Sequence, residues 1–89
     1  MKELFFTPKA WEDYTYWQTK DKKILLRINS IIKDLKRNPF DGIGMPEALK
    51  HEFSGYWSRR IDSTNRLVYE VLSDNDIRLI QCKGHYGDK

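Results

Sequence analysis

The clearest hydrophobic pattern in the chain lies in its first half, over residues 22–37. Apolar side chains recur there at intervals of three or four residues, with lysine and arginine between them: Ile24, Ile28, Ile31, Ile32 and Leu35. Because an α-helix has about 3.6 residues per turn, this spacing puts all of them on one face. The segment is therefore predicted to be an amphipathic helix with one buried face and one solvated, basic face.

A second helix is predicted just before it, over residues 9–20. Thr7 and Pro8 supply an N-cap followed by proline at the first helical position, which are favourable start signals. The helix carries four aromatic residues: Trp11, Tyr14, Tyr16 and Trp17. Their large apolar surfaces indicate core packing. A short strand is predicted over residues 2–6, and only Asp21 separates the two helices, so they are predicted to form an αα-hairpin.

The second half of the chain is predicted to form strands separated by turns. Residues 38–46, "NPFDGIGMP", end the helical pattern with proline and glycine, and one short helical turn is predicted from Pro46 through residue 50. Three runs rich in β-branched and aromatic residues follow, over 56–61, 66–72 and 77–83. Their short connectors imply antiparallel neighbours. We expect an α+β fold, with two N-terminal helices packed on one face of a small, mainly antiparallel sheet.

Side chains alternate between the two faces of a strand, so each run divides into an inward and an outward set. The set predicted to meet the helices is Trp57, Arg59, Ile61, Leu67, Tyr69, Val71, Ile80 and Cys82. The outward set is Tyr56, Ser58, Arg60, Arg66, Val68, Glu70, Gln81, Lys83 and, if the last strand continues, His85. Of the two adjacent arginines, Arg59 is interpreted as structural, with its head paired or reaching water, and Arg60 as available to a ligand.

The composition fits one small domain that spans residues 1–89. There are 16 Lys and Arg against 13 Asp and Glu, and this net charge of +3 would favour a polyanionic partner without establishing one. The single cysteine cannot form an internal disulfide, which fits a reducing compartment. No apolar stretch approaches the roughly 18 residues of a membrane span, and the N-terminus lacks the apolar core of a signal peptide. We expect a cytoplasmic protein that does not enter a membrane.

The outward face gathers the residue types that phosphate chemistry needs. The candidates are Arg60, Arg66, Lys83 and His85 on the strands, with Glu47, Lys50 and His51 in the short turn that could cover them. Taken singly, each is an ordinary surface residue, and a carboxylate just after a proline suits a first helical turn. Their convergence on one face is what suggests a site. Two histidines and one thiol, without zinc-type spacing, give no reason to expect a metal or another cofactor.

Several longer motifs resemble one known family. The run "PEALKHEFSGYWSRRIDSTNRLVYEV", with "W.DY.YW" upstream and "CKGHY" near the end, closely resembles the YoeB group of bacterial toxins, within the RelE/ParE superfamily. The similarity extends from about residue 2 to residue 86. It depends on "LKH", "G.WSRRI", "RLVY" and the terminal "HY" occurring in this order, since any one of them alone is unspecific.

The resemblance implies a microbial-ribonuclease-like fold and cleavage of messenger RNA in the ribosomal A site. It also implies neutralisation by a cognate, YefM-like antitoxin whose C-terminal segment wraps the toxin, and it allows a homodimer. Carried over position by position, the family's carboxylate falls on Glu47, its catalytic arginine on Arg66 and its histidine on His85. The positions that the family uses near the RNA or at its terminal tyrosine are Lys50, His51, Arg60 and Tyr86.

The chain departs from the family pattern at two places near its end. Gly84 stands before "HY" where some relatives carry a larger residue, which could loosen the backbone that holds His85. The chain also continues past Tyr86 with "GDK", where close relatives often end, and Asp88 in this tail could disturb phosphate binding.

As a hypothesis for the chemistry, Glu47 is the general base and His85 the general acid when a 2′-hydroxyl attacks the adjacent phosphorus, with the reverse assignment left open. Arg66 would brace the nonbridging oxygens, and Tyr86 would position or stack a base. Two alternatives are a ParE-like toxin that inhibits DNA gyrase, and a basic module that binds RNA or a partner without chemistry. Gyrase inhibition needs no acid–base set, and binding alone leaves message intact.

Overall fold

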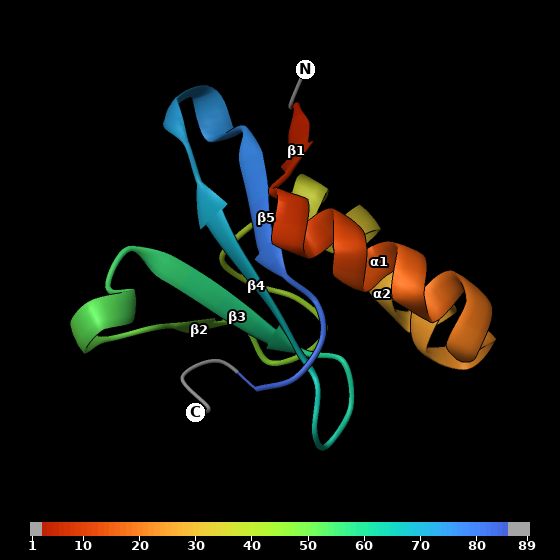
Figure 1. Cartoon of the computed structure of the whole chain (residues 1–89). Helices are drawn as coiled ribbons and strands as arrows, with labels where there is room; N and C mark the ends of the chain where they lie inside the picture. The colour runs from red at the N-terminus through yellow and green to blue at the C-terminus, as the bar shows by residue number, and fades with distance from the viewer. Residues whose placement is uncertain (1–2, 86–89) are drawn as a thin grey trace.

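The fold is a five-stranded sheet with two helices, shown by a computed structural model that describes residues 3–85 (Figure 1). The elements are β1 (Leu4–Phe6), α1 (Pro8–Lys20), α2 (Lys22–Arg37), β2 (Glu47–Ala48), β3 (Tyr56–Arg60), β4 (Arg66–Val71) and β5 (Ile77–Gln81), with short 3₁₀ turns at His51–Phe53 and Ser73–Asn75. The strand order is β1-β5-β4-β3-β2, and β1 lies parallel to β5 while the other pairs are antiparallel. The predicted α+β class is confirmed.

Helix α2 has the bounds that the sequence predicts, and α1 has the predicted Thr7 cap but begins at Pro8, one residue before the predicted start. The Thr7 hydroxyl accepts a hydrogen bond from the N–H of Ala10 at 3.1 Å, at the start of α1. Asp21 caps both helices, because its N–H donates to the Trp17 carbonyl while its carboxylate accepts from two N–H groups in the first turn of α2. A single residue thus joins the hairpin. Neither helix, nor any other within residues 3–85, is long and apolar enough to cross a membrane.

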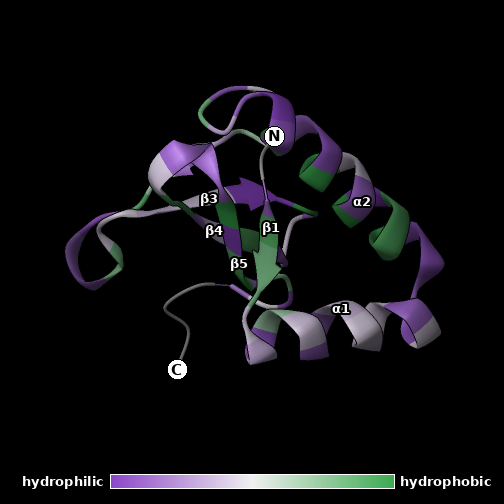
Figure 2. Ribbon diagram, turned by 90° about the horizontal axis from the view of Figure 1, so that it is seen from above, coloured by the Kyte–Doolittle hydropathy of each residue, from purple (hydrophilic) through white to green (hydrophobic). Residues whose placement is uncertain are grey.

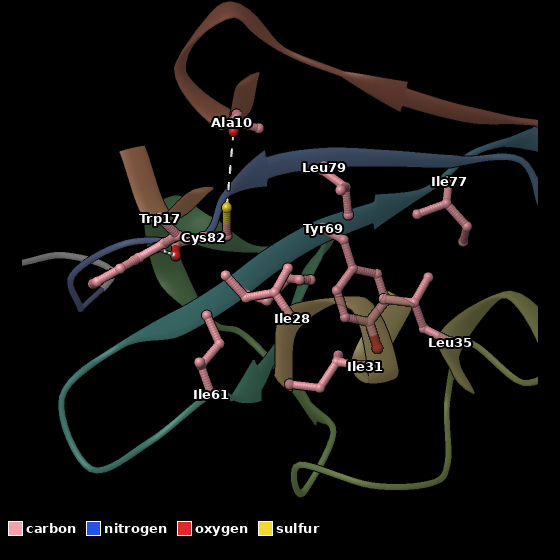
Figure 3. Close-up of a cluster of buried hydrophobic side chains, with 11 residues drawn as sticks. Ala10, Trp17, Ile28, Ile31, Leu35, Ile61, Tyr69, Ile77, Leu79 and Cys82 are labelled. Carbon is pink, nitrogen blue, oxygen red and sulfur yellow. Dashed lines mark hydrogen bonds between the residues drawn. The ribbon is translucent and has the colours of Figure 1, made fainter. Parts of the chain in front are cut away.

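The core lies between the helices and one face of the sheet. In Figure 2 the hydrophobic residues of α2 are on the side of the helix that is turned toward the strands. Figure 3 shows the ring of Tyr69 among the α2 side chains. The fully buried residues that α2, β4 and β5 contribute are Ile28, Ile31, Leu35, Leu67, Tyr69, Ile77 and Leu79. The prediction that Leu67 and Tyr69 face the helices is therefore confirmed, and Val71 packs against the same cluster.

Of the four aromatic residues in α1, only Trp17 enters the core. It is 8% exposed, and its indole N–H donates to the Cys82 carbonyl at 2.9 Å. Tyr14 is partly buried, but Trp11 and Tyr16 are 53% and 40% exposed, so the prediction of core packing is wrong for these two. The reason is that α1 covers the β1–β5 edge of the sheet, which offers a narrow surface to bury a helix face.

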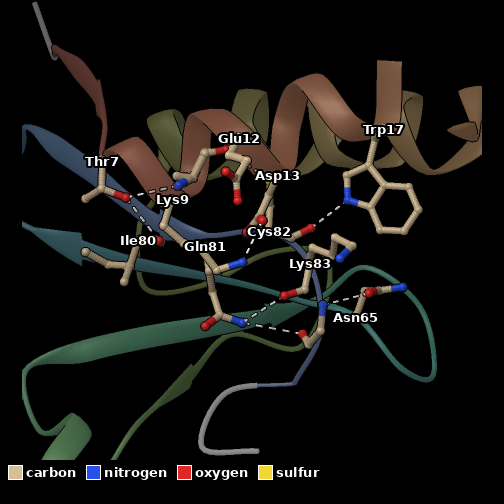
Figure 4. Close-up of polar contacts among 12 residues, drawn as sticks. Thr7, Lys9, Glu12, Asp13, Trp17, Asn65, Ile80, Gln81, Cys82 and Lys83 are labelled. Carbon is tan, nitrogen blue, oxygen red and sulfur yellow. Dashed lines mark hydrogen bonds and ion pairs between the residues drawn. The ribbon is translucent and has the colours of Figure 1, made fainter. Parts of the chain in front are cut away.

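Strand β5 contains a bulge that changes which of its residues face the core. Leu79 is fully buried in the core, whereas Ile80, for which alternation predicts an inward position, points away from α1 (Figure 4). Tyr69 pairs with Leu79 but Val68 pairs with Gln81, so β5 holds one extra residue between them. The bulge resets the alternation, and Cys82 lies in the core as predicted.

The predicted helical turn over residues 46–50 is wrong. Glu47 and Ala48 instead form the edge strand β2, which pairs with Ser58 and Trp57 of β3. The N–H of Leu49 then donates to the carbonyl of Tyr56 at 2.9 Å. Pairing with β3 satisfies this backbone and leaves Leu49 only 7% exposed, which an isolated helical turn would not achieve. Glu47 is therefore fixed on the sheet rather than on a turn above it.

Candidate functional site

The loop between α2 and β2 is held in place by one buried arginine. Arg59 is fully buried, and its Nη1 donates to the Asp34 carboxylate at 2.7 Å. Its other bonds go to the Tyr69 hydroxyl and to the loop carbonyls of Asn38, Asp41 and Ile43. The prediction that Arg59 is structural and paired is confirmed. Because β3 alternates, Arg60 lies on the opposite face of the sheet.

On that opposite face the side chains surround a cavity of about 360 Å³. It is lined by Met45, Pro46, Glu47, Ser58, Arg60, Arg66 and His85. The three residues that the resemblance assigns to chemistry thus line one cavity, although they come from β2, β4 and the segment after β5. One carboxylate, two guanidinium groups and one imidazole meet around a space of the size that small ligands occupy in proteins.

Glu47 and Arg60 belong to the hairpin at the edge of the sheet, and both are exposed. Among residues 3–85, neither side chain makes a hydrogen bond or an ion pair, so both can contact a ligand. The backbone N–H of Arg60 donates to the Gly44 carbonyl at 2.6 Å. This bond attaches the end of the loop, with Met45 and Pro46, to β3 beside the cavity.

Arg66 is the first residue of β4 and is partly buried. Its Nη1 donates to the carbonyls of Asp62 at 2.8 Å and Asn65 at 3.2 Å. Its Nε and Nη2 form no hydrogen bond with any residue that the structure describes. These two donors point along one edge of the guanidinium, and that fork geometry matches two oxygens of a phosphate.

His85 follows β5 and is partly buried. The preceding residue, Gly84, has a φ of +81°, in the left-handed region that favours glycine. Its N–H donates to the Asn65 side-chain oxygen at 2.7 Å, and its carbonyl accepts from the N–H of Arg66 at 2.9 Å. Gly84 is thus held on both sides, and its lack of a side chain does not leave the backbone before His85 unattached.

Three other residues named from the sequence, Lys50, His51 and Lys83, do not line this cavity. Lys50 and His51 are exposed and line a neighbouring cavity of about 510 Å³, formed by residues 47–53, which shares Glu47 with the first. Lys83, predicted on the open face, lies instead over the Tyr16 ring, with its Nζ 4.6 Å from the centroid. The correction arises because β5 ends at Gln81, so that alternation no longer applies. Tyr86 and the tail, residues 87–89, lie outside the described residues.

Some cavity residues have no signal in the sequence pattern. Met45 and Pro46 belong to an irregular loop, and only their proximity to Glu47 along the chain could have suggested them. Ser58 was expected on this face, but its burial at 3% exposed was not, and its neighbour across the strands, Val68, is 1% exposed. Within the described residues 3–85, no group of three or more His, Cys, Asp or Glu could hold a metal ion.

A comparison with protein families matches residues 6–86 to the family described as the YoeB-like toxin of bacterial type II toxin–antitoxin system. Among curated proteins, Toxin YoeB of Synechocystis sp. is 54% identical over 84 residues, which cover 94% of this chain and 96% of the relative. Toxin YoeB of Escherichia coli K12 is 49% identical over 84 residues, covering 94% of this chain and 99% of the relative.

Solved structures agree with the family match. A YoeB/ParE toxin from Agrobacterium tumefaciens superposes with a TM-score of 0.91 at 45% identity, covering 94% of this chain and 99% of that one. A chain of a YoeB–YefM complex from Staphylococcus aureus gives a TM-score of 0.86 at 46% identity, covering 97% and 99%. A YoeB dimer from the same organism gives 0.86 at 46%, covering 96% and 98%. The fold expected from the resemblance is confirmed.

Proposed function

Because this chain belongs to the YoeB-like toxin family of bacterial type II toxin–antitoxin systems, we propose that it cleaves messenger RNA in the ribosomal A site. The observation that supports this activity is the convergence of Glu47, Arg66 and His85 on one cavity, with Arg60 beside them. Cleavage of message on the ribosome stops translation, so the protein acts in the cytoplasm as an endoribonuclease.

The reaction is a transesterification within the RNA. Glu47, as general base, takes the proton of a 2′-hydroxyl, and the resulting oxygen attacks the adjacent phosphorus. The bond from phosphorus to the 5′-oxygen breaks, and His85, as general acid, gives that oxygen a proton. The products are a 2′,3′-cyclic phosphate and a 5′-hydroxyl end. The roles of Glu47 and His85 can be exchanged without changing this balance.

The arginines would stabilise the negative charge that develops on the phosphate in the transition state. The Nε and Nη2 donors of Arg66, which no described residue occupies, would bind the nonbridging oxygens as negative charge builds on them. Arg60 lines the same cavity and would hold a flanking phosphate. Lys50 and His51 line the neighbouring cavity, which shares Glu47 with the first, and would hold the next phosphate along the RNA. Tyr86 is assigned to stacking on a base.

The ribosome supplies what the small open site does not. In-line attack requires the 2′-oxygen, the phosphorus and the leaving oxygen to be aligned, and this alignment provides a large part of the rate in such reactions. Both Glu47 and Arg60 are exposed, so the site is completed by whatever holds the RNA against it. A message fixed in the A site meets this requirement.

The protein partner follows from the same family. Solved relatives include a YoeB–YefM complex and a YoeB dimer, both from Staphylococcus aureus. We accordingly infer that this chain is neutralised by a cognate, YefM-like antitoxin and that it can form a homodimer. An antitoxin that covers the cavity would exclude RNA from Arg66 and His85.

The deciding experiment is primer extension on message from ribosomes incubated with the purified protein. Wild-type protein should cut within the A-site codon and leave a 2′,3′-cyclic or 3′-phosphate end, whereas Glu47→Ala, Arg66→Ala and His85→Ala should each lose most cleavage. Removal of one transition-state donor lowers the rate of comparable enzymes by about 10²–10³-fold. A matched control is Glu70→Gln, which alters a carboxylate on the same face outside the cavity.

The two other functions give different results in the same preparation. A gyrase inhibitor would leave message intact and reduce DNA supercoiling, and a binding module would protect message without cutting it. Near-normal cleavage by all three alanine variants would show that the assignment of roles is wrong.

A further inference from the structure

The turn that connects β3 to β4, residues 62–65, lies beside the cavity and is held by several internal hydrogen bonds. The carboxylate of Asp62 accepts hydrogen bonds from the N–H groups of Thr64 and Asn65 at 2.8 and 2.6 Å. The side-chain amide of Asn65 donates to both oxygens of the same carboxylate, at 3.2 and 3.1 Å. These bonds fix the direction of the Asn65 amide, with its NH₂ group on Asp62 and its oxygen pointing the other way.

The free end of that amide reaches the far end of the chain. Asn65 Oδ1 accepts the N–H of Gly84 at 2.7 Å, and the N–H of the next residue, Arg66, donates to the Gly84 carbonyl at 2.9 Å. Figure 4 shows the Asn65 side chain meeting the segment that follows Cys82 and Lys83. Asn65 is only 9% exposed, so water does not readily replace these bonds. His85 is the residue directly after this attachment.

The same turn also orients Arg66. Nη1 of Arg66 donates to the carbonyls of Asp62 and Asn65, which turns the Nε and Nη2 edge away from the turn. Asp62 is exposed, and although partial desolvation favours its neutral form, the hydrogen bonds from Asn65 and Thr64, together with the charge of Arg66, outweigh this effect and hold its pKa below its ordinary value. Asp62 therefore stays ionised near neutral pH and keeps the Asn65 amide in place.

We propose that Asn65 is a positioning residue for the cleavage reaction, because its side chain joins the β3–β4 turn to Gly84 and so sets Arg66 and His85 at a fixed distance across the cavity. This inference rests on the proposed function. Asn65 does not line the cavity, and it acts only through the two residues that do. The left-handed backbone of Gly84 also contributes to this positioning, since it directs the chain from the Asn65 hydrogen bond back toward the cavity.

The first test is Asn65→Ala, with Ser63→Ala, an exposed residue of the same turn, as the matched control. Misplacement of an acid and an arginine by about 1 Å can lower a rate by about 10²-fold, so we expect the kcat of Asn65→Ala to fall by about 10- to 100-fold. The KM for ribosome-bound message should stay the same, because no group that contacts RNA has been removed. Ser63→Ala should match the wild type in both constants.

A second pair of variants acts on the other end of the bond and leaves the turn intact. A Cβ at Gly84 would meet no atom within 4 Å among the described residues beyond its two chain neighbours, so we attribute the effect of Gly84→Ala to the left-handed φ that alanine disfavours. Asparagine tolerates this conformation far better than alanine. We therefore expect Gly84→Ala to lose kcat and Gly84→Asn to recover most of it. Equal activities of the alanine and asparagine variants would overturn the proposal, and so would a wild-type kcat in Asn65→Ala.

A measurement without RNA separates this inference from the proposed function. In wild-type protein the Gly84 amide should exchange slowly with solvent, and in Asn65→Ala it should exchange fast while the ring signals of His85 shift and those of Trp17 stay in place. If wild-type protein does not cut message but shows this behaviour, the proposed function fails and the attachment of the His85 segment stands. If the Gly84 amide exchanges equally fast in both proteins, the attachment is refuted whatever the cleavage result.

Discussion

The two faces of the sheet each hold an arginine paired with a carboxylate, but in opposite surroundings. On the helix-covered face, Arg59 is fully buried, and one of its several partners is the carboxylate of Asp34, whose side chain is 22% exposed. On the open face, Arg78 pairs with Glu70 while their side chains stay 44% and 26% exposed. A charge interaction that water screens is worth several times less than one inside the protein. The first pair is therefore part of the fold, and the second contributes little to it.

The adjacent residues Arg59 and Arg60 bring the same contrast into a single dipeptide. Strand alternation turns one guanidinium into the protein and the other into the cavity. The open face can therefore keep Arg60 and Arg66 for a ligand, because the stability of the fold is supplied from the other side. The following experiments test whether the helix-covered face of the sheet supplies the stability of the fold while the open face supplies the function.

The largest expected effect is on stability. Arg59→Met removes the guanidinium that donates to Asp34, to the Tyr69 hydroxyl and to three loop carbonyls. Each buried acceptor that loses its donor costs about 1–3 kcal/mol, so a loss of several kcal/mol in the free energy of unfolding is expected. Urea denaturation followed by tryptophan fluorescence measures this loss. The matched variant Arg60→Met should change the same free energy by less than about 0.5 kcal/mol, and equal losses would refute the division between faces.

The next largest effect is on activity, and we expect it for a residue of the open face rather than of the covered face. Arg60→Met should slow the cleavage of ribosome-bound message about 10- to 100-fold, since a hydrogen bond to a charged group contributes about 1.5–3 kcal/mol. Arg78→Met, on the same face but outside the cavity, should cleave at the wild-type rate. Single-turnover primer extension compares the three proteins. Similar losses in both variants would indicate that the whole face, not the cavity, contacts RNA.

The pH dependence of stability offers a smaller effect on the covered face. The N–H of Ile43 and the guanidinium of Arg59 hold the pKa of Asp34 below its ordinary value of 3.8. Because this pKa is lower in the folded than in the unfolded state, ionised Asp34 stabilises the fold above about pH 4, and the contribution is lost as the pH falls through the folded-state pKa. Urea titrations between pH 6 and pH 2.5 should show this decline, in the range set by carboxyl titration. It should be shallower in Asp34→Asn than in Asp74→Asn, a control in the exposed β4–β5 connection.

The smallest effect concerns the exposed pair. Glu70→Gln removes the carboxylate that faces Arg78, and exposed ion pairs contribute about 0–1 kcal/mol. The free energy of unfolding should therefore change by no more than this amount at low salt and by less at high salt. A loss as large as that of Arg59→Met would mean that the open face also carries the stability of the fold.

Most of the fold could be predicted from the sequence because its signals are local. The bounds of α2 follow from the spacing of its apolar residues, and the hairpin follows from Asp21, whose short polar side chain caps one helix while its backbone ends the other. Strand alternation placed Leu67, Tyr69, Arg59 and Arg60 on their faces. The errors at Glu47 and Ile80 arose where a neighbouring strand decided the conformation. An edge strand and a β-bulge are both defined by pairing with a neighbouring strand, so the sequence of one segment does not reveal them.

The candidate site likewise has a part that could be predicted from the sequence and a part that could not. Glu47, Arg66 and His85 could be named from motifs, but their meeting around one cavity depends on three strands packing in order. Asn65 could not be found at all, because a turn asparagine beside Asp62 is ordinary turn chemistry in the sequence. Its bond to Gly84 spans 19 positions along the chain and becomes visible only in the folded protein.

The pairing of β1 with β5 also sets an order of events for a chain that is being made. Thr7 donates through its N–H to Leu79 and through its hydroxyl to Ile80, 73 positions further along, so the first strand has no partner until β5 has been made. Helices α1 and α2 can form early from local contacts, but the sheet closes last. The candidate cavity, which includes Arg66 of β4 and His85 after β5, is therefore completed only when the late strands have joined the sheet.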